Sequence, residues 1–350
     1  MKHQTTRYGE IPFYKIGTFG NTADAFISKK LFLEYKTKYS FPKKGDILIS
    51  ASGTIGRAVI YDGKPAYFQD SNIVWIDNDE TLVKNDFLFY AYSHVKWNTE
   101  HTTILRLYND NFRNTLIPLP SLNEQIAIAN ILSALDRYLY ALDALILKKE
   151  GVKKALSFEL LSQRKRLKGF NQAWQRVRLG DICEIVKGQQ INKISLNNTD
   201  KYPVINGGID FLGYTNKFNV SKNTIAISEG GTCGYVRFMT SNFWSGGHNY
   251  SLQKISNKVN NLCLYHILKS YEKDIMKLGV GSGLKNIQLK ALKDFEIPLP
   301  PLNEQSAIAN ILSALDNEIA SLKNKKRQFD NIKKALNHDL MSAKIRVLEK

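Results

Sequence analysis

Leucine and isoleucine residues recur at alternating spacings of three and four positions in two stretches of the chain. In residues 297–350 the pattern includes Ile308, Leu312, Leu315, Ile319, Leu322 and Phe329, and Lys326 occupies one seam position. In residues 117–168 the matching positions are Ile128, Leu132, Leu135, Leu139, Leu142 and Ile146. A narrow seam of this kind is typical of paired helices. It predicts one long helix in each stretch.

Prolines mark where these helices begin, because proline is tolerated at helix entry and excluded from the interior. They are Pro118 and Pro120 before the first helix, and Pro298, Pro300 and Pro301 before the second. Ser121 and Glu124 have the spacing of a capping box. Each helix has room for about 40 residues, or roughly 60 Å. We expect the two helices to pair with each other; the alternative is that each packs on its own globular part.

The two stretches are copies of one segment. Residues 117–136 read IPLPSLNEQIAIANILSALD and residues 297–316 read IPLPPLNEQSAIANILSALD, an offset of 180 with two differences in 20 positions. The globular parts ahead of them are related weakly: SASGTIG (50–56) aligns with SEGGTCG (228–234). A period this long indicates two copies of one large module rather than a solenoid.

The globular parts read as mixed α and β. Strands are predicted at 46–52, 58–63 and 72–77 in the first part and at 223–228, 234–239 and 249–255 in the second, with glycine turns between them. Apolar helices are predicted near 86–95 and 262–278.

Composition points to a polyanionic partner. The chain of 350 residues carries 49 Lys and Arg against 32 Asp and Glu, a net charge of +17. Nucleic acid is the favoured partner, and an anionic membrane surface is the second candidate. The alternative is a basic protein whose charge has no such role. Three widely spaced cysteines exclude a zinc ribbon and a disulfide scaffold and favour the cytoplasm. No secretory signal or membrane-spanning run is visible.

No catalytic motif stands out. The chain lacks a phosphate-binding P-loop, the Asn-Pro-Pro-aromatic motif of aminomethyltransferases and the Pro-Asp start of many metal-dependent nuclease sites. The six histidines do not have metal-ligand spacing. Gly279-Val-Gly-Ser-Gly283 looks like a dinucleotide loop but follows no clear strand. This leaves binding as the predicted activity.

A divergent domain followed by I-P-L-P-x-L-N-E-Q-x-A-I-A-N-I-L-S-A-L-D and a long helix, repeated twice, resembles the specificity subunit of type I restriction–modification systems. The resemblance implies an α+β fold with two mixed α/β target-recognition domains and two long helices forming an antiparallel coiled coil, related by a pseudo-twofold repeat. The expected divisions are 1–116 and 169–296 for the recognition domains and 117–168 and 297–350 for the spacer helices.

The resemblance also implies partners. They are double-stranded DNA with a split recognition sequence, two modification (methyltransferase) subunits, and restriction (translocase and nuclease) subunits, with no membrane. The subunit itself is expected to be non-catalytic and to bind no cofactor, S-adenosylmethionine, Mg²⁺ and ATP being expected on the partners. Docking is expected at the repeated Asn-Glu-Gln: Asn123, Glu124, Gln125, Asn303, Glu304 and Gln305.

DNA-contacting residues are predicted from their places beside the glycine turns. Candidate phosphate contacts are Lys43, Lys44, Arg57, Arg106, Lys187, Lys193, Arg237 and Lys285; the alternative for each is a solvated surface charge. Candidate base readers are Ser52, Gln189, Gln190, Asn206 and His248. For His248 a surface turn without a ligand is the alternative.

The second copy has a lead-in, Trp174-Gln-Arg-Val-Arg-Leu-Gly180, that the first copy lacks. We therefore expect the first recognition domain to be short at its N-terminal side, unless the tail Met341–Lys350 fills part of the gap. Other interpretations remain open: a silent or truncated specificity cassette, a coiled-coil protein-interaction scaffold, or an enzyme with an unrecognised site.

Overall fold

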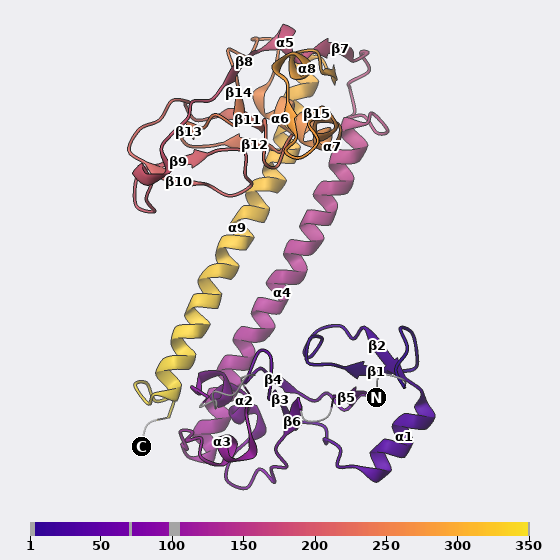
Figure 1. Ribbon diagram of the computed structural model, residues 1–350, viewed down its shortest axis with the longest axis vertical. Helices are drawn as coiled ribbons and strands as arrows, with labels where there is room; N and C mark the ends of the chain where they lie inside the picture. Colours follow the sequence, from indigo (N-terminus) through magenta and orange to yellow (C-terminus); the bar gives the residue numbers. More distant parts are fainter. Residues whose placement is uncertain (1–3, 70–71, 98–105, 349–350) are drawn as a thin grey trace. The chain divides into compact units, whose positions relative to one another are not determined.

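The computed structural model describes residues 4–69, 72–97 and 106–348. The chain divides into two compact units: unit 1 comprises Met1–Asp143 and Asn324–Lys350, and unit 2 comprises Ala144–Lys323. Two helices of 40 residues each, α4 (Leu122–Leu161) and α9 (Leu302–Met341), are divided between the units, so that part of each helix belongs to unit 1 and the rest to unit 2 (Figure 1). In the described part of the chain, no helix is both long and apolar enough to cross a membrane.

The described residues of unit 1 form two small sheets and three short helices ahead of α4. One sheet has the order β2-β1-β5 and the other the order β4-β3-β6. Their strands are β1 (Ile11–Tyr14), β2 (Ala25–Ile27), β3 (Ile47–Ser50), β4 (Ala58–Ile60), β5 (Tyr67–Phe68) and β6 (Ile73–Trp75). The helices are α1 (Lys29–Lys38), α2 (Asn85–His94) and α3 (Asn109–Arg113).

Strand β3 is the centre of unit 1 because both of its faces are buried. Ile47 and Ile49 face Leu88 and Tyr92 of α2, whereas Leu48 packs into a separate aromatic cluster. Both neighbours of β3 pair with it antiparallel. An apolar run without strict alternation is what a strand covered on both faces requires.

Unit 2 repeats this plan with more strands. Its sheets have the orders β10-β9-β13, β12-β11-β14-β8, β15-β16 and β17-β7. The strands are β7 (Gln175–Arg178), β8 (Glu184–Lys187), β9 (Tyr202–Ile205), β10 (Gly213–Thr215), β11 (Thr224–Ser228), β12 (Val236–Met239), β13 (Trp244–Ser245), β14 (Asn249–Gln253), β15 (Gly279–Val280), β16 (Asn286–Ile287) and β17 (Glu296–Leu299). The helices are α5 (Leu179–Ile182), the 3₁₀ turn η1 (Lys193–Ser195), α6 (Asn261–Ser270), α7 (Glu272–Lys277) and α8 (Leu289–Lys293).

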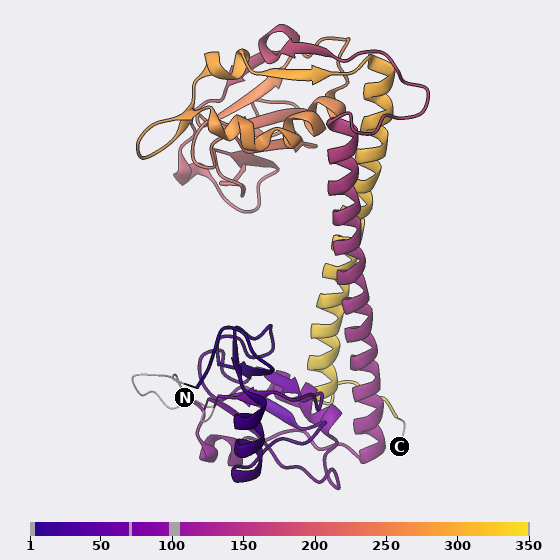
Figure 2. The same ribbon diagram turned by 90° about the vertical axis from the view of Figure 1, so that its right-hand side faces the viewer.

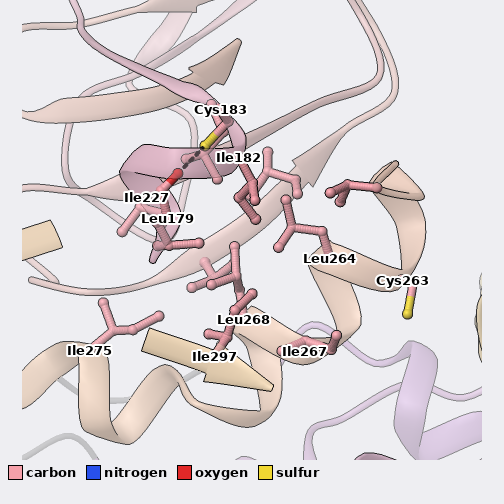
Figure 3. Close-up of a cluster of buried hydrophobic side chains, with 14 of the residues drawn as sticks. Leu179, Ile182, Cys183, Ile227, Cys263, Leu264, Ile267, Leu268, Ile275 and Ile297 are labelled. Carbon is pink, nitrogen blue, oxygen red and sulfur yellow. Dashed lines mark hydrogen bonds between the residues drawn. The ribbon is translucent and has the colours of Figure 1, made fainter. Parts of the chain in front are cut away.

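The main core of unit 2 lies between its four-stranded sheet, α6 and the first turns of α9. Figure 3 shows Leu179 and Ile182 of α5 drawn in the same cluster as Leu264 and Leu268 of α6. The Cys183 thiol is buried here and donates to the carbonyl of Leu179 at 3.2 Å. Burial raises the pKa of this thiol to about 12, so it behaves as an apolar side chain.

Helices α4 and α9 lie side by side within each unit (Figures 1 and 2). In unit 1, Asp136 pairs with Lys333, and Asp143 pairs with Lys326 at 2.9 Å. In unit 2, Lys153 pairs with Asp316. As the residue number on α4 increases, the number of its partner on α9 decreases, so the two helices are antiparallel. With the offset of 180, the Asp136 pair and the Asp316 pair are the same contact made twice.

The repeated Asn-Glu-Gln segment ties each long helix to its own globular part. In unit 1, the Gln125 side-chain oxygen accepts from the backbone N–H of Lys84 at 2.8 Å, and its amide donates to the carbonyls of Leu82 and Pro120. In unit 2, Gln305 makes the same three bonds, with Asn260, Lys258 and Pro300. Both side chains are buried.

This burial corrects part of the predicted docking surface. Glu124, Gln125, Glu304 and Gln305 are buried inside the chain, so their side chains do not offer a surface to another subunit. The docking role was implied by the family resemblance, whereas in the structure Gln125 and Gln305 bond to backbone groups of the same chain. Only Asn123 and Asn303 remain exposed, and for these two the docking role stays a prediction.

Both long helices and all six predicted strands are present in the structure, although the strand boundaries differ by a few residues. The strands predicted at 46–52, 58–63 and 72–77 correspond to β3, β4 and β6, and those in the second part to β11, β12 and β14. The helix predicted over 262–278 is wrong as one element: it divides into α6 and α7, because Tyr271 leaves the helical conformation between them.

Candidate nucleic-acid interface

In unit 2, several loops approach one another closely at the end of the two main sheets. A Cβ on Gly207 would lie 2.6 Å from the Gly230 carbonyl oxygen, and one on Gly188 would lie 2.1 Å from that of Gly246. Gly207 also has a φ of +83°, which side chains rarely adopt. Glycine is therefore required for loops 188–190, 206–208, 229–232 and 246–248 to meet.

Glu229 lies at the centre of these loops, at the end of β11. Its carboxylate accepts from Lys187 Nζ at 2.6 Å, and His248 Nδ1 lies 3.9 Å from its other oxygen. The Tyr250 hydroxyl donates to the carbonyl of Ile287 at 3.0 Å and lies 3.4 Å from Glu229 Oε1. Burial, together with the Glu229 charge, raises the pKa of Tyr250 to about 12, so the hydroxyl keeps its proton.

Four of the predicted base readers come together around this cluster. Gln189, Gln190 and His248 are exposed, and Asn206 is half-buried. The backbone fixes their loops: the Gln189 carbonyl accepts from Trp244 Nε1 at 2.9 Å, and Asn206 Oδ1 accepts from the His248 N–H at 3.1 Å. Gln190 lies against Gly247, where a Cβ would meet its Nε2 at 2.6 Å. Side-chain amides held this way are suited to reading base edges.

The predicted phosphate contacts of unit 2 divide into two groups. Lys285 and Lys193 are exposed, and Lys285 lies on the loop between β15 and β16, which is joined to the cluster by a bond from the Ile287 N–H to the Glu229 carbonyl. Lys187 is used by Glu229. Arg237 is also used within the chain, because its guanidinium donates to the Gly208 and Ile209 carbonyls and holds that loop.

In unit 1, the predicted residues are brought together only in part. Ser52 pairs with Arg106 in an isolated bridge and donates to Asn72 at 2.8 Å. Arg57, on the same turn, is exposed and donates to the Gly20 carbonyl at 3.3 Å. Lys43 and Lys44 precede β3, whereas Ser52 follows it, so they lie at opposite ends of that strand. Lys43 also pairs with Asp77 at 3.1 Å.

Comparison with known proteins identifies the chain. The family model described as "Type I restriction modification DNA specificity domain" matches residues 1–149 and 171–329. The chain belongs to the type I restriction–modification specificity subunit family. The two matched regions include the glycine turns of both units.

Relatives of this specificity-family chain are found in several microorganisms. A putative type I restriction enzyme specificity subunit of Haemophilus influenzae is 62% identical over 137 residues, 39% of this chain and 36% of the relative. A putative specificity subunit of Methanocaldococcus jannaschii is 29% identical over 87% of this chain and 79% of the relative. The alignments with the first relatives cover 36–41% of those proteins' length.

A solved structure shares the fold. The crystal structure of a type I restriction–modification S subunit from M. genitalium superposes with a TM-score of 0.72 at 21% identity, covering 97% of this chain and 91% of that one. This likeness shows that the chain shares the α+β fold of that structure.

Glu229 and Tyr250 are the residues of this cluster that sequence reasoning missed. Glu229 stands between a strand and a Gly-Gly turn, and its only sequence signal is an acidic residue beside a turn in a basic chain. Among residues 4–69, 72–97 and 106–348, no group of His, Cys, Asp and Glu side chains is arranged to hold a metal. Gly279–Gly283, considered as a dinucleotide loop, begins the β15–β16 hairpin.

Proposed function

We propose that this chain is the DNA-reading subunit of a type I restriction–modification enzyme and that each unit reads one half of a bipartite duplex site. The observation that carries the proposal is the loop cluster of unit 2, where exposed amide and imidazole side chains stand beside lysines on a rigid glycine framework. Lysine supplies sequence-independent affinity for phosphates, and side-chain amides supply direct readout of bases in the major groove.

Glu229 would give the cluster selectivity as well as rigidity. A carboxylate accepts hydrogen bonds and repels phosphate, so it favours base edges that present amino groups. Lys187, paired with it, orients the carboxylate in the free protein. Releasing Lys187 to a phosphate on binding would leave Glu229 free to accept from a base.

The chain would act as part of a complex. We propose that two modification subunits dock on the exposed faces that include Asn123 and Asn303 and that restriction subunits join through them. Chemistry and its cofactors, S-adenosylmethionine, Mg²⁺ and ATP, would belong to these partners. The chain would contribute sequence recognition without catalysis.

The test is a map of methylated bases. The chain is co-expressed with its modification subunit in a host that lacks DNA methylation, and modified bases are located by long-read sequencing. We expect a two-part motif with a fixed gap. A motif with one defined half would mean that unit 1 does not read DNA. A stable complex that methylates nothing would refute the proposal and favour a silent cassette or a scaffold.

Two variants assign the reading to the cluster. Gln190→Ala removes an exposed amide and should relax the motif at one position, because one bidentate contact is worth about 1–3 kcal/mol of discrimination. Gln172→Ala removes another exposed amide, from the segment before β7, and should leave the motif unchanged. Equal motifs from both variants would contradict a reading role for Gln190.

A further inference from the structure

An exposed apolar loop lies beside the cluster of candidate base readers in unit 2. Residues 208–212 lie between β9 and β10 and begin two residues after Asn206 (Figure 1). Ile209 is 55% exposed, and Phe211 and Leu212 are exposed as well. Neighbouring apolar side chains in water, unlike single ones, are typical of a binding surface. The position of this loop points to the ligand of the cluster.

The loop is held in its exposed position by hydrogen bonds to its backbone. At its start, the Gly207 carbonyl accepts from the Thr232 N–H at 2.8 Å. In its middle, the Arg237 guanidinium donates to the carbonyls of Gly208 and Ile209. A loop fixed at these points is not free to turn its apolar side chains into the core. They are therefore available to a ligand without prior reordering.

Arg237 also positions the Phe211 ring. Its guanidinium lies 5.7 Å from the centroid of the Phe211 ring and 5.0 Å from that of Tyr235. The Tyr214 ring meets Phe211 edge-on, with 6.0 Å between the ring centroids. Phe211 nevertheless stays 44% exposed. Arg237 is therefore a positioning residue of the loop, and the rest of the phenylalanine ring remains open to a ligand.

The chemistry of the loop fits one kind of base pair. Asp210 is exposed and lies between Ile209 and Phe211. Its carboxylate accepts hydrogen bonds and repels phosphate, so the loop suits base edges rather than the DNA backbone. In the major groove an A·T pair presents an amino group and the C5-methyl of thymine, whereas a G·C pair presents an amino group without a methyl. An acidic side chain flanked by apolar ones therefore matches an A·T pair.

The corresponding loop of unit 1 is built differently. Residues 15–24 join β1 to β2, the strands that hold the places of β9 and β10 in the sheet order. The phenylalanine of that loop, Phe19, is buried and packs in one cluster with Leu48 and Tyr61. A contact made by the apolar loop of unit 2 is therefore not expected in the half-site that unit 1 reads.

We propose that Ile209 and Phe211 contact the C5-methyl of a thymine in the half-site read by unit 2, while Asp210 accepts from the amino group of the paired adenine. This inference rests on the proposed DNA-reading function and adds a specificity determinant to it. It requires an A·T pair in that half-site. Removal of the thymine methyl should weaken binding about fourfold, the usual contribution of one buried group of this size.

The experiment uses the complex of this chain with its modification subunits and duplexes that carry the mapped motif. The half-site of unit 2 is the one in which Gln190→Ala relaxes the motif. Each thymine of that half-site is replaced in turn by deoxyuridine, which lacks only the methyl, and fluorescence anisotropy gives the affinity. We expect a fourfold loss for the wild-type chain at one thymine or more. The double variant Ile209→Ala with Phe211→Ala should bind both duplexes equally.

Phe218→Ala is the matched control. Phe218 is also 44% exposed, but it contacts Tyr202, at the other end of β9 from the cluster, so this variant should keep the fourfold loss. Equal affinity of the wild-type chain for both duplexes, a half-site without an A·T pair, or an unchanged thymine preference in the double variant would overturn the proposal. So would loss of the modification subunits from the double variant, because the loop would then contact protein. Absence of any sequence-specific binding would refute the DNA-reading function itself, and this contact with it.

Discussion

Replacing Arg166 by methionine should destabilise unit 2 far more than an ordinary ion-pair variant. Arg166 donates twice to Glu304, whose carboxylate is almost wholly buried. Methionine keeps much of the aliphatic stem but leaves the carboxylate with one donor, the indole of Trp174. Breaking a buried pair from one side costs about 3–5 kcal/mol. Because the Arg166 side chain is 24% exposed, we expect the lower end, about 3 kcal/mol.

The internal repeat supplies the control. Arg346 stands at the counterpart position, is exposed, and makes no ion pair within residues 4–69, 72–97 and 106–348. Arg346→Met should therefore change stability by about 0.5 kcal/mol or less. The double variant Arg166→Met with Glu304→Leu removes both charges and should recover much of the loss, as replacement of buried pairs often does.

Native-state hydrogen exchange, read by mass spectrometry on peptides that contain β7 and β17, measures the effect locally. The opening free energy of these two strands should fall in Arg166→Met and stay unchanged in Arg346→Met. A loss below about 1 kcal/mol, or equal losses in both variants, would refute the argument that Glu304 depends on Arg166.

Three further predictions concern other parts of the chain. Gly207→Ala should abolish or strongly weaken DNA binding in a filter-binding assay and cost about 1–3 kcal/mol of stability, because its Cβ would lie 2.6 Å from the Gly230 oxygen at a φ of +83°. Gly208→Ala, whose Cβ meets nothing nearer than 3.6 Å, should bind normally in the same assay. Burial lowers the pKa of His266 to about 4, so as the pH falls this histidine is protonated in the unfolded chain before it is protonated in the folded one, and unit 2 should lose roughly 3 kcal/mol of stability between pH 6.5 and pH 4. Urea titrations across this range should show that His266→Phe removes this dependence of stability on pH. An unchanged pH dependence would contradict the assignment. Asp316→Lys should lower the thermal midpoint by placing two cations together, and adding Lys153→Asp should restore most of it; no recovery in the double variant would mean that the two charges do not interact.

The long helices were predictable because their signals are long and repeated. The seam positions Ile128, Leu132, Ile308 and Leu312 are buried as predicted, and Lys326, the odd residue in the seam, finds Asp143 as its partner. The prolines predicted the helix starts to within a few residues. They did not give the first helical residue, because β17 and the turn after it come before the start of α9 at Leu302.

The candidate site was predictable only where glycine turns identified loops. Gln190, Asn206 and His248 stand beside such turns and do gather. Lys43 and Lys44 do not join Ser52, because sequence adjacency to a strand does not say at which end of it a side chain lies. Strands such as β9, β10 and β13 were missed because two to four residues are too few to show a period.

Gln125 and Gln305, which join each long helix to its globular part, have a consequence for which domain sequences the chain can carry. Every partner of these two amides in the globular parts is a backbone group, at Leu82, Lys84, Lys258 and Asn260. Backbone groups are the same whatever side chain a residue carries, so the joint places no demand on the composition of the domain it holds. The same glutamine contact can therefore hold two domains of different sequence, and a domain with different surface residues can be attached through it without a change in the helix.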